Sequence, residues 1–139
     1  MWSDVWSLTE LAGPYNEIMQ LGGIEKLANL TSLDLSNNAI TDLLPLAHLT
    51  KLRYLYLSSN NDLADLTGLE PLIDLIVLDL QSNSIVDITP LLENCYRGGL
   101  GFMNNVYLNG NPLSAESGNA ITDILEQNLV TVYDDCDGM

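Results

Sequence analysis

Basic residues are scarce in this 139-residue sequence, in which four Lys and Arg stand against 19 Asp and Glu and give a formal net charge of -15. Proteins that bind nucleic acids or anionic membranes do so through clustered basic side chains that contact phosphate groups. Lys26, Lys51, Arg53 and Arg97 are too widely spread along the chain to form such a cluster. The sequence therefore argues against a nucleic-acid-binding protein and against binding to an anionic membrane.

Long hydrophobic runs are absent as well. The most apolar stretch, residues 72–80, is interrupted by Asp74 and Asp79. It is far shorter than the roughly 20 residues that a helix needs to cross a bilayer. The first residues include an acid and no base, whereas a secretory signal begins with a basic segment. We therefore expect a soluble chain that either stays in the cytosol or is a piece of a longer protein.

Cysteine and histidine are nearly absent. Cys95 and Cys136 are too few for a disulfide framework, and two alternatives stay open: unpaired thiols, or one bridge that joins the tail to the segment around Cys95. His48 is the only histidine, and no motif ties a serine or cysteine nucleophile to it as a catalytic triad requires. We interpret His48 as an ordinary surface residue.

Two segments match ligand-binding motifs only in part. The segment Gly98-Gly-Leu-Gly101 lacks the Lys-Ser or Lys-Thr that completes a phosphate-binding loop. The tail contains the Asp-x-Asp-Gly part of a calcium loop, but Tyr133 stands at the first ligand position and the closing Glu is missing. We interpret the tail as a solvated acidic segment. The sequence thus predicts no enzyme, no cofactor and no metal site.

Leucine and isoleucine, by contrast, are abundant and recur at a fixed interval of 22 residues. The third unit contains one additional residue, at Asn61 or Asp62, and the fifth is delayed by an insertion at residues 94–102. In the degenerate first unit, Gly13 replaces a leucine. The units begin at Leu8, Leu30, Leu52, Leu75 and Met103.

The pattern Leu-x-x-Leu-x-Leu-x-x-Asn-x-Ile-x-Asp-Leu-x-x-Leu, from Leu30 to Leu46, resembles the leucine-rich-repeat family. It is most similar to the 22-residue class, which includes the bacterial internalins, and the resemblance covers residues 8–133. It implies an α/β solenoid: a right-handed coil with a parallel sheet on the concave face, an irregular convex side and a short C-terminal cap helix. It also favours an extracellular or cell-surface location.

The resemblance divides the chain into three parts. Residues 1–7, with Trp2, Val5 and Trp6, form an N-terminal lid or are the remnant of a truncation. Residues 114–139 form a cap and an acidic tail, in which Ser114 or Ser117 begins the helix. Its inward face is expected to hold Ile121, Ile124 and Leu125, and Val130, Val132 and Tyr133 to add a last strand. Between them, residues 8–113 hold five repeats: 8–29, 30–51, 52–74, 75–102 and 103–113 onward.

Two polar columns accompany the leucines. The asparagines end the strands where the backbone turns inside the stack, and we expect their amides to pair buried backbone groups. The aspartates follow, and we expect each carboxylate to accept backbone amide bonds in a turn on the outer side rather than to bind metal. The asparagines are Asn38, Asn60, Asn83 and Asn111, with Asn16 in the degenerate unit, and the aspartates are Asp42, Asp65 and Asp87.

The candidate binding surface consists of the strand residues that point away from the core. Tyrosine combines a large contact area with a polar group, so Tyr54, Tyr56 and Tyr107 are the expected anchors. Asp34 and Asp79 flank Tyr56 and favour a partner protein with a basic patch. The predicted partner-binding residues are Asp34, Tyr54, Tyr56, Val77, Asp79, Asn105 and Tyr107.

Other interpretations of this surface stay open. Aromatic rings also stack on sugars, so a carbohydrate is an alternative ligand, and Asn, Ser and Tyr residues near Tyr107 suit it. The repeats are alternatively a passive spacer or a fragment of a larger bacterial surface protein, whose polar sheet residues only maintain solubility. We expect the chain to be a monomer.

Overall fold

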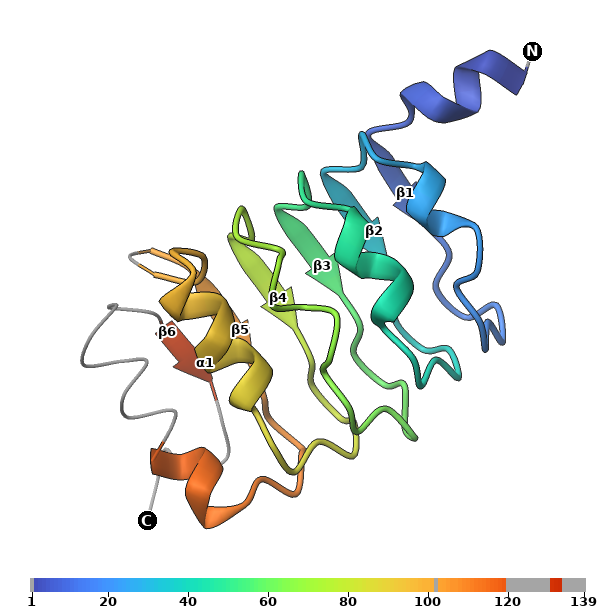
Figure 1. Ribbon diagram of the computed structural model, residues 1–139. Helices are drawn as coiled ribbons and strands as arrows, with labels where there is room; N and C mark the ends of the chain where they lie inside the picture. The colour runs from blue at the N-terminus through green and yellow to red at the C-terminus, as the bar shows by residue number, and fades with distance from the viewer. Residues whose placement is uncertain (1, 102, 120–130, 134–139) are drawn as a thin grey trace.

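The structure is a computed structural model, and it describes residues 2–101, 103–119 and 131–133. Successive coils form a solenoid with one short strand per coil, and the strands make a single parallel sheet in the order β1 to β6 (Figure 1). The predicted leucine-rich solenoid is therefore confirmed. The strands are β1 Glu10–Ala12, β2 Ser32–Asp34, β3 Tyr54–Tyr56, β4 Val77–Asp79, β5 Asn105–Tyr107 and β6 Thr131–Tyr133.

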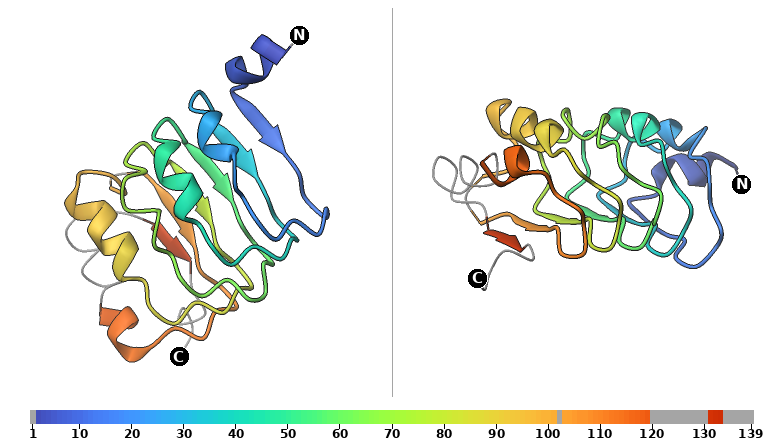
Figure 2. Two further views of the ribbon diagram at one scale, coloured as in Figure 1. Left: turned by 45° about the vertical axis from the view of Figure 1, so that its right-hand side comes forward. Right: turned by 90° about the horizontal axis from the view of Figure 1, so that it is seen from below.

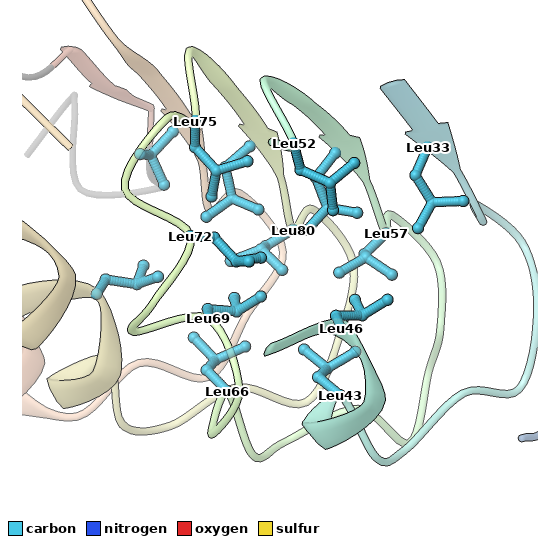
Figure 3. Close-up of a cluster of buried hydrophobic side chains, with 14 of the residues drawn as sticks. Leu33, Leu43, Leu46, Leu52, Leu57, Leu66, Leu69, Leu72, Leu75 and Leu80 are labelled. Atoms are coloured by element: carbon cyan, nitrogen blue, oxygen red, sulfur yellow. The ribbon is translucent and has the colours of Figure 1, made fainter. Parts of the chain in front are cut away.

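The hydrophobic core runs along the axis of the solenoid. Leu33 of β2 lies in register with Leu55 of β3, which in turn pairs with Leu78 of β4, and all three are fully buried. Leucines from successive coils point toward one another inside the coils (Figure 3). A single coil cannot bury its own leucines, so each coil depends on its neighbours for its stability.

The convex side is made of short helical turns, which lie opposite the sheet (Figure 2). They are η2 Ile24–Lys26, η3 Leu44–His48 and the α-helix α1 Thr89–Tyr96, and a further 3-10 helix, η1 Trp2–Ser7, precedes the first strand. The sequence predicted an irregular convex side, and α1 was not foreseen. Pro90 stands in its first turn, where the missing backbone N–H costs no hydrogen bond.

Asn94 anchors α1 and the inserted segment that follows it. Its side chain is fully buried; Nδ2 donates to the carbonyl oxygens of Leu69 (2.8 Å) and Leu72 (3.0 Å), while Oδ1 accepts from the amide of Leu100 (2.8 Å). One side chain thus ties the insertion to the preceding coil. No repeat position marks Asn94, which is why the sequence pattern did not single it out.

The predicted asparagine column is confirmed in the interior of the stack. Asn60 is fully buried, accepts the amide of Ile40 at Oδ1 (3.0 Å), and donates from Nδ2 to the carbonyl oxygens of Leu35 (3.1 Å) and Leu57 (3.0 Å). Asn38, Asn83 and Asn111 make equivalent bonds. Asn16 differs: it is exposed, and its Nδ2 bonds Pro14 in its own turn.

The residue that precedes each asparagine has a left-handed backbone. The φ angles are +58° at Tyr15, +56° at Asn37, +57° at Ser59, +56° at Ser82 and +74° at Gly110. Non-glycine residues adopt this region at a cost. The conformation recurs where the chain turns sharply, and the amides of Tyr15, Asn37, Ser59 and Ser82 still bond the following coil, as Ser59 N does to Gln81 O (2.9 Å).

The two ends of the solenoid differ. At the C-terminal end, Ser114 Oγ accepts the amide of Ser117 (3.1 Å) and so begins the helical residues 115–119, while the buried Ser117 hydroxyl donates to Val86 O (2.7 Å). Ile121, Ile124, Leu125 and Val130 lie outside the described residues. At the N-terminal end, Val5 is 37% and Trp6 48% exposed, and the alternatives of a lid and a truncation remnant both stay open.

Candidate functional site

The exposed face of the sheet carries two columns of side chains, one on each side of the buried central residue of every strand. Strand register places Asp34 beside Tyr56, Tyr56 beside Asp79, and Asp79 beside Tyr107. Ser32, Tyr54, Val77 and Asn105 form the parallel column in the same way. All seven predicted site residues therefore lie on one continuous surface, which we call the concave face.

Strand β3 occupies the middle of this face. Tyr54 is 36% exposed and Tyr56 is half-buried, while Leu55 between them is fully buried. The alternation follows from the two-residue period of a strand, which turns both rings to the same side. Neighbouring strands lie about 4.8 Å apart, so the backbone positions of Asp34 and Asp79 are about 9.6 Å apart, with Tyr56 between them.

The carboxylates of Asp34 and Asp79 are held in the same way. Oδ1 of Asp34 accepts the amide of Ser36 (3.0 Å), and Oδ1 of Asp79 accepts the amide (3.1 Å) and side-chain Nε2 (3.1 Å) of Gln81. The second oxygen of each carboxylate has no partner among the described residues, and neither aspartate forms an ion pair there. Both acids thus remain able to bind a cationic group of a partner.

The second aspartate column lies on another side of the coils and has a structural role. Asp65 Oδ1 accepts the amide (2.9 Å) and hydroxyl (2.6 Å) of Thr67, and Asp87 bonds Thr89 identically. Both aspartates have a lowered pKa. The hydrogen bond from the threonine hydroxyl is the largest cause, and the bond from the threonine amide is the second. Asp42 accepts the amide of Leu44 (2.9 Å). The predicted turn contacts are confirmed, and no metal-binding cluster occurs among the described residues.

The residues most suited to chemistry are separated from one another. His48 is exposed at the end of η3. Cys95 is 5% exposed, and burial raises the pKa of its thiol to about 11. Gly98 (φ +85°) lies in the segment after α1 rather than between a strand and a helix. Cys136 and the acidic tail, residues 134–139, lie outside the described residues, so both alternatives for the cysteines stay open and the solvated acidic tail stays a prediction.

No helix in the described part of the chain is long and apolar enough to cross a membrane.

Comparison with known proteins finds sequences and structures that contain the same kind of repeat. A family model described as leucine rich repeats, in two copies, matches residues 28–71. The solved structure of internalin C2 from Listeria monocytogenes is similar over 91% of this chain, with 31% identity and a TM-score of 0.74. The chain belongs to the leucine-rich-repeat family. A leucine-rich-repeat protein of Leptospira interrogans is similar over 93% of this chain, with 26% identity and a TM-score of 0.75.

This leucine-rich-repeat chain spans 52% of the internalin C2 structure and 32% of the Leptospira structure. A Shigella effector leucine-rich-repeat domain shares the fold over 94% of this chain and 56% of that domain, at 21% identity and a TM-score of 0.66. No curated protein sequence matches the chain. Internalin-like leucine-rich repeats are in general non-enzymatic modules for protein interaction.

Proposed function

We propose that this leucine-rich-repeat protein is a non-enzymatic, monomeric binding module whose concave face binds a partner protein. The main support is the arrangement at β3, where Tyr54 and Tyr56 face the same side of the sheet and Tyr56 lies between Asp34 and Asp79. Tyrosine is enriched among residues that dominate binding energy, and a surface fixed by strands loses little conformational entropy when it binds.

The proposed partner surface is basic. Asp34 and Asp79 each offer an oxygen without a partner among the described residues, and the whole chain has a net charge of -15. A basic partner associates faster with this acidic surface because opposite charges attract, and acidic proteins are disfavoured because like charges repel. The binding residues in this proposal are Asp34, Tyr54, Tyr56, Val77, Asp79, Asn105 and Tyr107.

Alanine substitution tests the proposal. The full chain is used as bait for secreted and cytosolic fractions of the source organism, the captured partner is identified by mass spectrometry, and its affinity is measured. We expect Tyr54→Ala and Tyr56→Ala each to weaken binding by about tenfold or more, as interface hot spots do. Tyr96→Ala is the matched control, because Tyr96 is 60% exposed on α1, on the convex side.

The thermal midpoint of each variant separates lost contacts from lost folding. Weaker capture with an unchanged midpoint supports the concave face as the binding surface. Unchanged capture by both tyrosine variants contradicts the proposal and favours a spacer. Capture of a glycan, inhibited by free sugar and insensitive to salt, favours the carbohydrate alternative.

A further inference from the structure

A narrow strip of the concave face runs along the solenoid axis, across the strands. The central residue of each strand points into the core, so no side chain rises between the two exposed columns. Residues two apart in a strand are separated by about 6.6 Å, which sets the distance between the columns. We call this the axial strip; one column beside it holds Ser32, Tyr54, Val77 and Asn105, and the other holds Asp34, Tyr56, Asp79 and Tyr107.

Two carboxylates lie along this strip at a defined interval. Asp34 and Asp79 stand two strands apart, so their backbone positions are separated by about 9.6 Å. Each has a carboxylate oxygen without a partner among the described residues. Neither column contains Lys or Arg from β1 to β6. A ligand with two basic side chains at this interval on one of its sides therefore matches the charge of the strip.

Two tyrosines border the strip on the strand between these acids. Tyr54 and Tyr56 project from β3 on either side of the fully buried Leu55. Neither hydroxyl forms a hydrogen bond within the described part of the chain. No buried polar side-chain atom there lacks a partner, so the hydroxyl of half-buried Tyr56 reaches solvent. Both hydroxyls can therefore donate to backbone carbonyls of a ligand, while the rings pack against its apolar side chains.

The interval between the acids selects the backbone conformation of the ligand. In a polyproline II helix, residues three apart lie on the same side at about 9.3 Å, because the rise is about 3.1 Å and a turn contains three residues. In a β-strand, residues on one side are about 6.6 or 13 Å apart, and neither value matches. An α-helix presents residues seven apart at about 10.5 Å, but it is about 10 Å wide and binds through an apolar face. Val77 is the only aliphatic residue in the two columns from β2 to β5, so the strip does not suit an α-helix.

We propose that the axial strip binds a proline-rich segment of the partner in the polyproline II conformation, with two prolines between two basic residues. The basic residues bind Asp34 and Asp79. The proline pair lies between them, over Tyr54 and Tyr56, and its carbonyls accept from the tyrosine hydroxyls. Aromatic surfaces bind such segments because their conformation is already formed before binding. This inference rests on the proposed function, since it names the class of partner segment that the concave face binds.

Two blocked peptides of equal composition and charge test the interval. The matched peptide is Pro-Pro-Lys-Pro-Pro-Lys-Pro-Pro. The mismatched peptide is Pro-Pro-Pro-Lys-Lys-Pro-Pro-Pro, whose lysines are only about 3.1 Å apart along the helix axis and point to different sides. Each is titrated into the isotope-labelled full chain, and the dissociation constant is obtained from amide shifts in NMR spectra. We expect saturable shifts in β2, β3 and β4, and about fivefold tighter binding of the matched peptide, because it forms one more charge pair.

Asp34→Asn and Asp79→Asn test whether these two acids cause the preference. Each variant keeps a side-chain oxygen that can accept the amide of Ser36 or Gln81, so the thermal midpoint should not change. With one carboxylate removed, both peptides form a single charge pair, and the preference for the matched peptide should disappear. Glu93→Gln is the matched control, because it removes the same charge from an exposed side chain of α1 on the convex side. It should keep the preference.

Equal binding of the two peptides by the wild type would overturn this proposal, as would a preference that both asparagine variants retain. Tighter binding of a helical peptide with lysines seven residues apart would also overturn it, because it assigns the strip to an α-helix. If Tyr54→Ala and Tyr56→Ala lose the captured partner while the two peptides bind equally, the proposed function holds and only the polyproline class is wrong. If the tyrosine variants change neither capture nor peptide binding, both proposals fail.

Discussion

The hydrogen bonds of the buried asparagine column predict how much stability each asparagine contributes. In Asn60→Ala, the amide of Ile40 loses its bond to Asn60 Oδ1, and Ile40 is fully buried. The carbonyl of Leu35 still accepts from Asn38 Nδ2 (2.9 Å), and that of Leu57 still accepts from Asn83 Nδ2 (3.1 Å). The substitution therefore orphans one buried donor and removes one of two bonds at each carbonyl.

The expected loss of stability follows from the number of hydrogen bonds that the substitution removes. An orphaned buried amide costs about 1–3 kcal/mol, and each further lost hydrogen bond costs about 1 kcal/mol. We therefore expect Asn60→Ala to lower the free energy of unfolding by about 3–5 kcal/mol. Asn38→Ala is the matched control near the N-terminal end of the described chain, where it frees the amides of exposed Asn16 and half-buried Ile18. Groups that are not fully buried cost less to leave unpaired. Asn38→Ala should therefore cost about 1–2 kcal/mol.

Urea denaturation followed by circular dichroism measures both values. The cost of a lost hydrogen bond depends on burial, so the decisive quantity is the difference between the free energies of unfolding that Asn60→Ala and Asn38→Ala lose. Equal losses for Asn60→Ala and Asn38→Ala, or a loss below about 1 kcal/mol at Asn60, would refute it.

Three further predictions concern single positions. Ser59→Gly should stabilise the chain by about 1 kcal/mol in urea denaturation, because the φ of Ser59 is +57°, whereas Gly110→Ala should destabilise it, since its Cβ would lie 3.2 Å from Ser82 Oγ. Thr67→Val should raise the pKa of Asp65 in an NMR titration. Because the Asp65 pKa is lowered in the folded state, ionised Asp65 adds to the free energy of unfolding above pH 3.8, its ordinary pKa. This contribution disappears as the pH falls through the folded-state pKa, and the free energy lost on acidification should be smaller in Thr67→Val than in the wild type. In Cys136→Ser, Cys95 should react with a thiol reagent only after unfolding, because it is buried and its pKa is about 11; rapid reaction of the folded chain would contradict this.

The repeat period by itself determined the solenoid. Leucines that recur every 22 residues have one way to share a core, which is to stack coil on coil. That stacking fixed which strand residues are buried, such as Leu55, and which are exposed, such as Tyr54. The asparagine column followed too, because every coil repeats the same buried turn and leaves the same backbone groups unpaired.

Only the tertiary structure decided the features that break the repeat. Helix α1 and Asn94 lie in or beside an insertion, so their contacts with the preceding coil have no periodic signal. The exposure of the β1 residues likewise depends on where their coil stands in the described stack, because the sequence pattern around Leu11 resembles that around Leu33. Their burial differs because Leu33 has described coils on both sides and Leu11 on one. Periodicity specifies what each coil contributes, whereas contact with a neighbouring coil decides what is buried.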